Sequence, residues 1–229
     1  MYIHNPTSAI VYRFICLFTC FFGLFFNVMP FTASRILHML SYFTILTNIL
    51  CLIVYIYCIL ISTKSLLTGK PAHYSDTVIY YKGLATLSAI VSCVVYNFVL
   101  QSEDVTHTMR GIMVIGRNDL FVHYLVPFLT VGDWLMFQPK GMFKWRYCIS
   151  WLIYPLIYLF VMMPVTHISN DYPYFFMNIN ENGWNTFLSV LLFMAVLCIV
   201  TGTAIVACDN IVDYIFPTNY SCRHTKNDT

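Results

Sequence analysis

Five long stretches of this chain contain no Asp, Glu, Lys or Arg, and they constrain its fold more than any other feature. They cover residues 14–34, 36–63, 83–102, 147–170 and 182–208. Each has 20 or more residues, which is enough for an α-helix to cross a hydrocarbon layer about 30 Å thick. A sixth stretch, 120–138, is interrupted only by Asp133. The pattern predicts a polytopic integral membrane protein.

The composition excludes most other classes of protein. Of the 229 residues, 59% are hydrophobic and 10% are charged, whereas a soluble domain carries about 25% charged residues. The net charge of +2 is too small for a nucleic-acid-binding protein, so we expect no nucleic-acid partner. The nine cysteines are odd in number and lie mostly within the apolar stretches, which does not predict a disulfide framework.

The apolar stretches are typical of helices. They lack the strict alternation of polar and apolar residues that barrel strands show over about ten residues, and a helix satisfies its own backbone hydrogen bonds in lipid. We therefore expect an all-α protein with one transmembrane domain over residues 1–229, in which six helices form one bundle. The expected spans are about 9–29, 36–62, 77–101, 119–138, 147–168 and 185–208, followed by a C-terminal tail at about 209–229.

The basic residues predict the orientation of the six spans. One side of the membrane would hold nine of them: Arg13, Lys64, Lys70, Lys82, Lys140, Lys144, Arg146, Arg223 and Lys226. The opposite side would hold three: Arg35, Arg110 and Arg117. Loops rich in Lys and Arg stay in the cytoplasm, so we expect both termini to be cytoplasmic. Lys82, early in the third span, is expected to extend toward the cytoplasmic headgroups.

The second span has one polar face. Ser41, Thr44 and Asn48 follow i, i+3, i+7 spacing, and Thr47 lies beside them, so they share a side of a helix. One interpretation is structural, because a transmembrane Thr often bonds the carbonyl four residues earlier and an Asn joins helices. The other is that this face lines a cavity.

The fourth span carries a second polar face, with Asp119, His123, Pro127 and Thr130 at i, i+4, i+8 and i+11. Pro127 removes a backbone hydrogen bond and is expected to kink the helix. An ionisable group within a span is a candidate functional residue, although a neutral imidazole bonded to a neighbouring helix is the alternative for His123. Ser88, Ser92 and Tyr96 form a similar face on the third span.

The depths of two of these side chains are similar. At 1.5 Å per residue, Thr44 lies roughly 12 Å along a helix that starts near residue 36, and His123 lies roughly 6 Å along one that starts near 119. A kinked helix could close the remaining offset of about one turn. A hydroxyl beside an imidazole is the minimum for a nucleophile and its base, so the pair is a candidate catalytic site.

Several motifs resemble a known group of membrane proteins. They are Phe43-Thr44-Ile45-Leu46-Thr47-Asn48, His123-Tyr124-Leu125-Val126-Pro127-Phe128-Leu129 with Asp133-Trp134, Tyr154-Pro155-Leu156-Ile157-Tyr158, and Tyr172-Pro173-Tyr174-Phe175-Phe176. In order and spacing, from about residue 36 to 200, they are similar to small bacterial six-span membrane proteins. Those proteins are distantly related to the androgen-induced-gene and androgen-dependent TFPI-regulating proteins, which are threonine hydrolases of fatty-acid esters of hydroxy fatty acids.

The resemblance implies an intramembrane hydrolase of lipid esters, with Thr44 as nucleophile and His123 as general base. It also allows an alignment in which Thr47 takes the place of Thr44. It implies membrane lipids or a lipid ester as the partner, and the inner (cytoplasmic) membrane of a bacterium as the location. We expect no cofactor and no metal, because the sequence contains no zinc-ligand pattern.

Such a mechanism needs a donor for the oxyanion, for which Asn48 and Asn97 are the candidates. Asp119 is the candidate to orient the imidazole.

Two other functions fit the same sequence. The protein could be non-catalytic, as a transporter of lipids or small molecules or as a structural partner of other membrane proteins. It could also be an acyltransferase that uses the same site and differs only in what attacks the acylated intermediate. Transporters often carry charges deep in their spans and paired Gly/Pro breaks, which the sequence does not suggest here.

Overall fold

The computed structural model describes residues 3–100 and 117–216, and these residues form helices and turns with no strand. The α-helices are α1 (Pro6–Val28), α2 (Ala33–Leu40), α3 (Phe43–Thr68), α4 (Asp76–Val95), α5 (Arg117–Leu120), α6 (Val126–Phe137), α7 (Tyr147–Ser150), α8 (Ile153–Ser169) and α9 (Ile179–Ile215). Two π-helical turns, η1 (Tyr96–Leu100) and η3 (Phe121–Leu125), continue α4 and precede α6, and η4 (Phe175–Met177) is a 3₁₀ turn.

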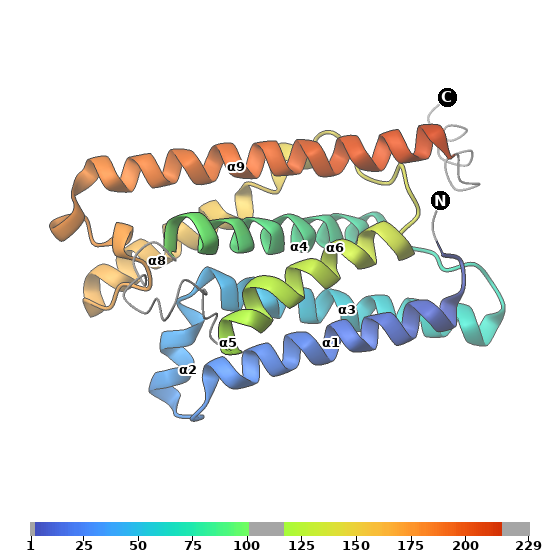
Figure 1. Ribbon diagram of the computed structural model, residues 1–229, viewed down its shortest axis with the longest axis horizontal. Helices are drawn as coiled ribbons and strands as arrows, with labels where there is room; N and C mark the ends of the chain where they lie inside the picture. Colours follow the sequence, from blue (N-terminus) through green and yellow to red (C-terminus); the bar gives the residue numbers. More distant parts are fainter. Residues whose placement is uncertain (1–2, 101–116, 217–229) are drawn as a thin grey trace, which may run out of the picture.

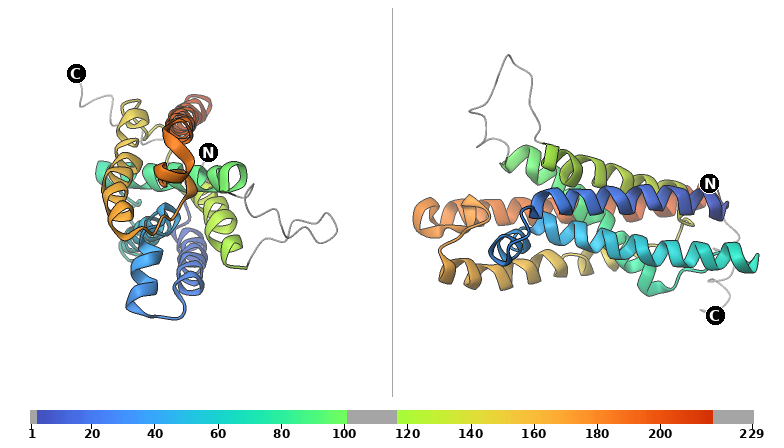
Figure 2. Two further views of the ribbon diagram at one scale, coloured as in Figure 1. Left: turned by 90° about the vertical axis from the view of Figure 1, so that its left-hand side faces the viewer. Right: turned by 90° about the horizontal axis from the view of Figure 1, so that it is seen from below.

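The long helices run along one axis of an elongated bundle (Figure 1). Five helical segments are long and apolar enough to cross a membrane: 6–28, 43–68, 76–100, 147–169 and 179–215. The helix over 121–137 is apolar but shorter. The segment formed by α4 and η1 is the most buried of the five, and two further views place α4 in the middle of the bundle (Figure 2). The chain is therefore an all-α polytopic membrane protein.

The structure divides the second expected span into two helices. Instead of one helix over 36–62, α2 ends at Leu40 and α3 begins at Phe43. Two tyrosines far away in the sequence stabilise this break with their hydroxyl groups. The hydroxyl of Tyr158 donates to the carbonyl of Ser41 at 2.8 Å, and that of Tyr174 accepts from the amide of Phe43 at 3.1 Å. These contacts satisfy backbone groups that a continuous helix would have paired internally.

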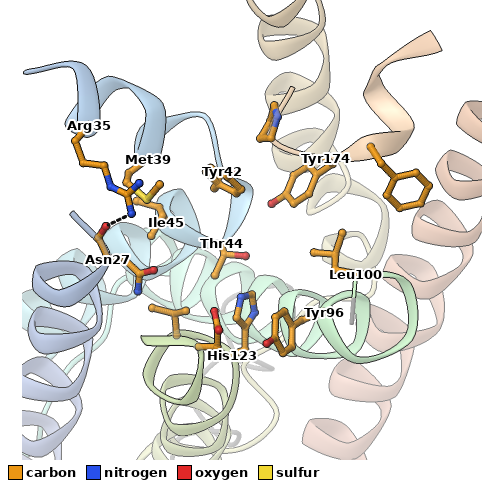
Figure 3. Close-up of a pocket in the computed structure, with 14 residues that line it drawn as sticks. Asn27, Arg35, Met39, Tyr42, Thr44, Ile45, Tyr96, Leu100, His123 and Tyr174 are labelled. Carbon is orange, nitrogen blue, oxygen red and sulfur yellow. Dashed lines mark hydrogen bonds between the residues drawn. The ribbon is translucent and has the colours of Figure 1, made fainter. Parts of the chain in front are cut away.

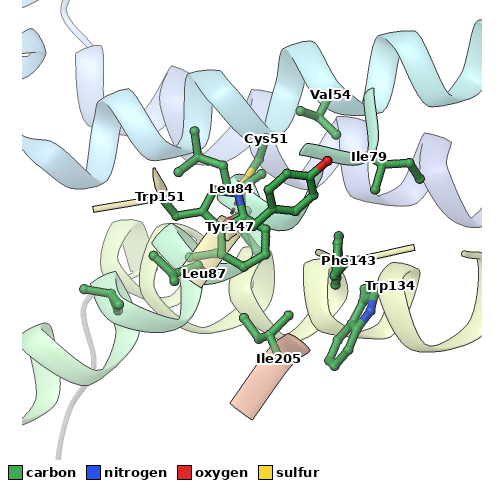
Figure 4. Close-up of a cluster of buried hydrophobic side chains, with 14 of the residues drawn as sticks. Cys51, Val54, Ile79, Leu84, Leu87, Trp134, Phe143, Tyr147, Trp151 and Ile205 are labelled. Atoms are coloured by element: carbon green, nitrogen blue, oxygen red, sulfur yellow. Dashed lines mark hydrogen bonds between the residues drawn. The ribbon is translucent and has the colours of Figure 1, made fainter. Parts of the chain in front are cut away.

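The core packs around one tryptophan. Trp151 is fully buried, and its indole nitrogen donates to the carbonyl of Tyr80 on α4. A Cβ atom at Gly83 would collide with the indole ring, so the absence of a side chain there lets Trp151 lie against α4. Figure 4 shows Trp151 beside Tyr147 and Leu84 in this cluster. Close approach at small residues is a common means by which membrane helices associate.

A buried group of three charges connects α1, α4 and α6. Nε of Arg13 lies 2.8 Å from one carboxylate oxygen of Asp133, and Nζ of Lys82 lies 2.6 Å from the other. Arg13 also donates to the hydroxyls of Ser62 and Tyr74. The prediction that Lys82 extends to the headgroups is therefore wrong, because Lys82 is 2% exposed and the carboxylate of Asp133 holds its ammonium inside the bundle.

The last helix extends beyond its expected end. The sequence predicts a tail from about residue 209, but α9 continues to Ile215. Asp209 is buried and accepts hydrogen bonds from the indole of Trp134 and from the amides of Met142 and Phe143. These bonds fix the loop after α6 against α9, and they explain why the helix persists past an acidic residue.

Removing the carboxylate of Asp133 is expected to destabilise the protein strongly. Asp133→Asn leaves two buried cations without a counter-charge, which should cost about 3–5 kcal/mol in the free energy of unfolding. Lys82→Met should cost less, because the pair between Arg13 and Asp133 remains. Unfolding in detergent, followed by circular dichroism, measures both. Asp171→Asn is the control, since Asp171 pairs with His38 at an exposed site and such pairs contribute at most about 1 kcal/mol. Equal losses for all three variants would contradict the expectation.

Candidate functional site

A cavity of about 340 Å³ lies at the end of the bundle opposite the start of α1 and the end of α9. Its walls come from α1, α2, α3, η1, α5, η3 and the loop before η4. Thr44 and His123 both line it, and Figure 3 shows them close to each other. The two residues that the sequence singled out thus share one cavity.

Thr44 lies in the first turn of α3. Because the chain breaks at 41–42, α3 begins only one residue earlier, at Phe43, so Thr44 stands at the end of a 26-residue helix instead of about 12 Å along one. The N-terminus of a helix carries a partial positive charge that stabilises nearby anions. The break therefore removes the expected offset in depth from His123 and puts the Thr44 hydroxyl where negative charge is favoured.

A π-helical turn positions His123. Pro127 has no amide hydrogen, so it cannot bond the carbonyl of His123 as an α-helix requires. The chain instead forms η3, in which the amide of Val126 bonds the carbonyl of Phe121, five residues back. The imidazole stacks on Tyr96, with ring centroids 3.9 Å apart and planes 14° apart. Tyr96 begins the other π-helical turn, η1, and π-helical turns are frequent at functional sites.

Ser92 connects the threonine to the histidine. Its Oγ lies 3.0 Å from Oγ1 of Thr44 and 3.5 Å from Nδ1 of His123. All three side chains are buried. The sequence placed Ser92 on a polar face with Tyr96 but gave it no chemical role. The signal in the sequence was the i, i+4 spacing of Ser92 and Tyr96. This spacing puts the Ser92 hydroxyl on the same side of the helix as the Tyr96 ring, which stacks on His123.

Tyr174 is a second residue that the sequence analysis did not select for chemistry. It lines the cavity, and Figure 3 shows its hydroxyl pointing toward Thr44. Because its oxygen accepts the amide hydrogen of Phe43, its own hydrogen is oriented away from that amide. Burial raises the pKa of Tyr174 to about 12, so the phenol is a hydrogen-bond donor at neutral pH.

The other predicted site residues occupy different environments. Asn48 donates its amide hydrogens to the carbonyls of Thr44, at 2.8 Å, and Val122, at 3.5 Å, which is the role of a residue that joins helices. Asn97 accepts from Tyr124 and donates to the carbonyl of Cys93.

Thr47, Asn48 and Asn97 are not among the described residues that line the cavity, whereas Asp119 is. Asp119 comes from α5, one turn before His123.

One cation, Arg35, is among the described residues that line the cavity. Its Nη2 donates to the carbonyl of Asn27 at 3.2 Å. Within residues 3–100 and 117–216, no three side chains of His, Cys, Asp or Glu gather in a group suited to a metal ion. The groups that the cavity offers for chemistry are hydroxyls, an imidazole, phenols, the carboxylate of Asp119 and the guanidinium of Arg35.

Comparisons with protein-family models, with curated proteins and with solved structures found no match for this chain.

Removing the Tyr174 hydroxyl is expected to destabilise the end of the bundle around the cavity. Tyr174→Phe leaves the buried amide of Phe43 without its acceptor, which should cost about 1–3 kcal/mol in the free energy of unfolding. Thermal or urea unfolding in detergent measures the loss. Tyr214→Phe is the matched control, because Tyr214 lies on α9 and is 87% exposed. If both variants unfold like the wild type, the bond between Tyr174 and Phe43 does not hold the break.

Proposed function

We propose that the protein is an intramembrane hydrolase of fatty-acid esters, with Thr44 as nucleophile and His123 as general base. The observation that carries the proposal is the chain of contacts from Thr44 through Ser92 to His123, at 3.0 and 3.5 Å, whose two ends, Thr44 and His123, line one cavity. The motif-level resemblance to threonine hydrolases in the membrane supports the same assignment.

The first half of the reaction acylates the threonine. Oγ1 of Thr44 attacks the ester carbonyl carbon while its proton moves to Ser92, and the proton of Ser92 moves to Nδ1 of His123. The hydroxyl of Tyr174 donates to the carbonyl oxygen as it becomes negative. The bond between the carbonyl carbon and the alkoxy oxygen then breaks. The alcohol leaves with the proton that His123 returns, and the acyl group stays on Thr44.

The second half releases the acid. A water molecule attacks the acyl-threonine, and His123 again accepts a proton, from that water. The bond between the acyl carbon and Oγ1 breaks, and Thr44 recovers its proton through Ser92. The sum of the two halves is ester plus water to acid plus alcohol. An acyltransferase would share the first half and use an alcohol or amine in place of water in the second.

We propose a six-pass topology with both termini cytoplasmic. The helix over 121–137, extended by α5, would be the sixth crossing, since the start of α1 and the end of α9 lie at the same end of the bundle. The basic loops favour the cytoplasm for that end. The cavity would then open toward the outer leaflet, in a membrane such as the inner membrane of a bacterium.

A carrier is the second candidate function. The cluster of Arg13, Lys82 and Asp133 favours it, because ionisable groups inside a bundle often mark an ion or substrate path. A second cavity, of about 390 Å³, reaches Ser62 and Tyr74, which both contact Arg13. If the protein is a carrier, the Thr44→Ala variant should move the substrate into proteoliposomes as well as the wild type does. If it is only a hydrolase, proteoliposomes should show no uptake that depends on Asp133.

Substitutions in the proton relay formed by Thr44, Ser92 and His123 are expected to lower or abolish hydrolysis of p-nitrophenyl fatty esters by the purified protein. His123→Ala should lower kcat by about 100-fold or more, since it removes the base, and Thr44→Ala should remove acylation altogether. Ser92→Ala should lower kcat with little change in KM, because Ser92 relays a proton. Release of p-nitrophenolate measures each rate.

Ser88→Ala is the matched control for Ser92→Ala, because Ser88 is buried one turn earlier on α4 and does not belong to the relay. It should retain the wild-type rate. Full activity in Thr44→Ala together with its loss in Thr47→Ala would make Thr47 the nucleophile. Full activity in both variants would remove the threonine mechanism.

The topology is tested by labelling single cysteines in a Cys-free background. Ser75→Cys, before α4, and Asp171→Cys, after α8, lie at opposite ends of the bundle. In intact cells a membrane-impermeant maleimide should label position 171 only, and in inverted vesicles position 75 only. Labelling of both positions from the same side would contradict the proposed topology.

A further inference from the structure

A third cavity lies between α8 and α9. It has a volume of about 110 Å³ and an apolar wall, with Pro155 and Leu159 on α8, and Leu191, Ala195 and Cys198 on α9. Such a space holds hydrocarbon better than water, because apolar cavities of this size stay dry and accept apolar ligands. Both α8 and α9 present large apolar side chains on their outer faces, including Phe160 and Leu192.

A narrow gap of about 20 Å³ shares lining residues with both the apolar cavity and the polar one. Thr44 and Ser92 line the gap, and Thr44 also lines the polar cavity. On the other side, Tyr174, Phe176 and Met194 line both the gap and the apolar cavity. The hydroxyl of Thr44 therefore stands where a polar space meets an apolar one.

The side chains around the gap differ in how firmly they are held. Tyr174 and Phe176 stack with planes 4° apart and centroids 5.4 Å apart, and both are buried. Met194 is only partly buried, and a methionine has three rotatable bonds that adapt to irregular spaces. Of the side chains that line both the gap and the apolar cavity, Met194 is therefore the one best able to change its rotamer.

We propose that the cavity between α8 and α9 is the acyl-chain subsite of the enzyme, so that its substrates are esters of medium- or long-chain fatty acids whose chain points from Thr44 toward α9. This inference rests on the proposed function for its chemistry. The acyl chain passes between Tyr174 and Met194 into the apolar cavity, and the alcohol part stays in the polar cavity with Arg35 and Asp119. The carbonyl then lies at Thr44, at the junction.

The kinetic test fills the cavity from one side. Ala195→Trp places an indole in a space of comparable size, and Val196→Trp is the matched control, because Val196 is the next residue on α9 and faces outward, 51% exposed. For each variant, kcat/KM relative to wild type is measured with p-nitrophenyl acetate and with the decanoate in the same detergent. Ala195→Trp should keep the acetate value within twofold and lose at least 10-fold with the decanoate. Val196→Trp should keep both.

Equal losses with acetate and decanoate in Ala195→Trp would overturn the subsite and leave the hydrolase intact. A second readout does not depend on hydrolysis. The full-length protein in detergent is irradiated with palmitic acid that carries a diazirine in its chain, and the adducts are mapped by mass spectrometry. Cys198 is 2% exposed, so an adduct there reports a chain inside the cavity.

The adduct on Cys198 should form in the wild type and in Val196→Trp, and should be lost in Ala195→Trp. If the wild type gives no adduct on Cys198, the proposal is wrong whether or not the protein hydrolyses esters. If the adduct forms and no ester is hydrolysed, the acyl-chain subsite stands and the proposed hydrolase fails.

Discussion

The break between α2 and α3 is the feature on which the candidate site depends. Two tyrosine hydroxyls, from Tyr158 and Tyr174, satisfy the backbone groups that the break exposes. A helix end that is buried without such partners leaves its backbone polar groups unsatisfied. Because of the break, α3 begins one residue before Thr44. Thr44 therefore lies at the N-terminus of a helix and lines the same cavity as His123. Without the break, the same threonine would be one more hydroxyl inside a span.

The site also relies on irregular helix geometry on its other side. Pro127 prevents a regular α-helical bond at His123, and a π-helical turn takes its place. The imidazole then lies between Tyr96, on which it stacks, and Ser92, which links it to Thr44. Both π-helical turns, η1 and η3, contribute residues to this cavity, and such turns are frequent at functional sites.

At the opposite end of the bundle, buried charged side chains connect the helices. Arg13, Lys82 and Asp133 are buried together, and Asp209 fixes the loop after α6 to α9. These contacts connect α1, α4, α6 and α9 to one another at the end of the bundle away from the Thr44 cavity. Open spaces remain at both ends of the bundle, since a cavity of about 390 Å³ reaches Ser62 and Tyr74 beside Arg13, and the polar cavity is lined by Thr44 and His123.

The sequence by itself determined the membrane class, the helical fold and the two residues, Thr44 and His123, that the structure brings to one cavity. Those inferences follow from local physics: an apolar stretch of 20 residues has few alternatives in lipid, and residues at i, i+4 share a helix face. The tertiary structure alone decided the break before Thr44, the buried position of Lys82, and the roles of Ser92 and Tyr174 beside the threonine. Each of these depends on partners more than 30 residues away in the chain, and a pattern within one helix does not reveal which side chain from another helix will fill the space in front of it.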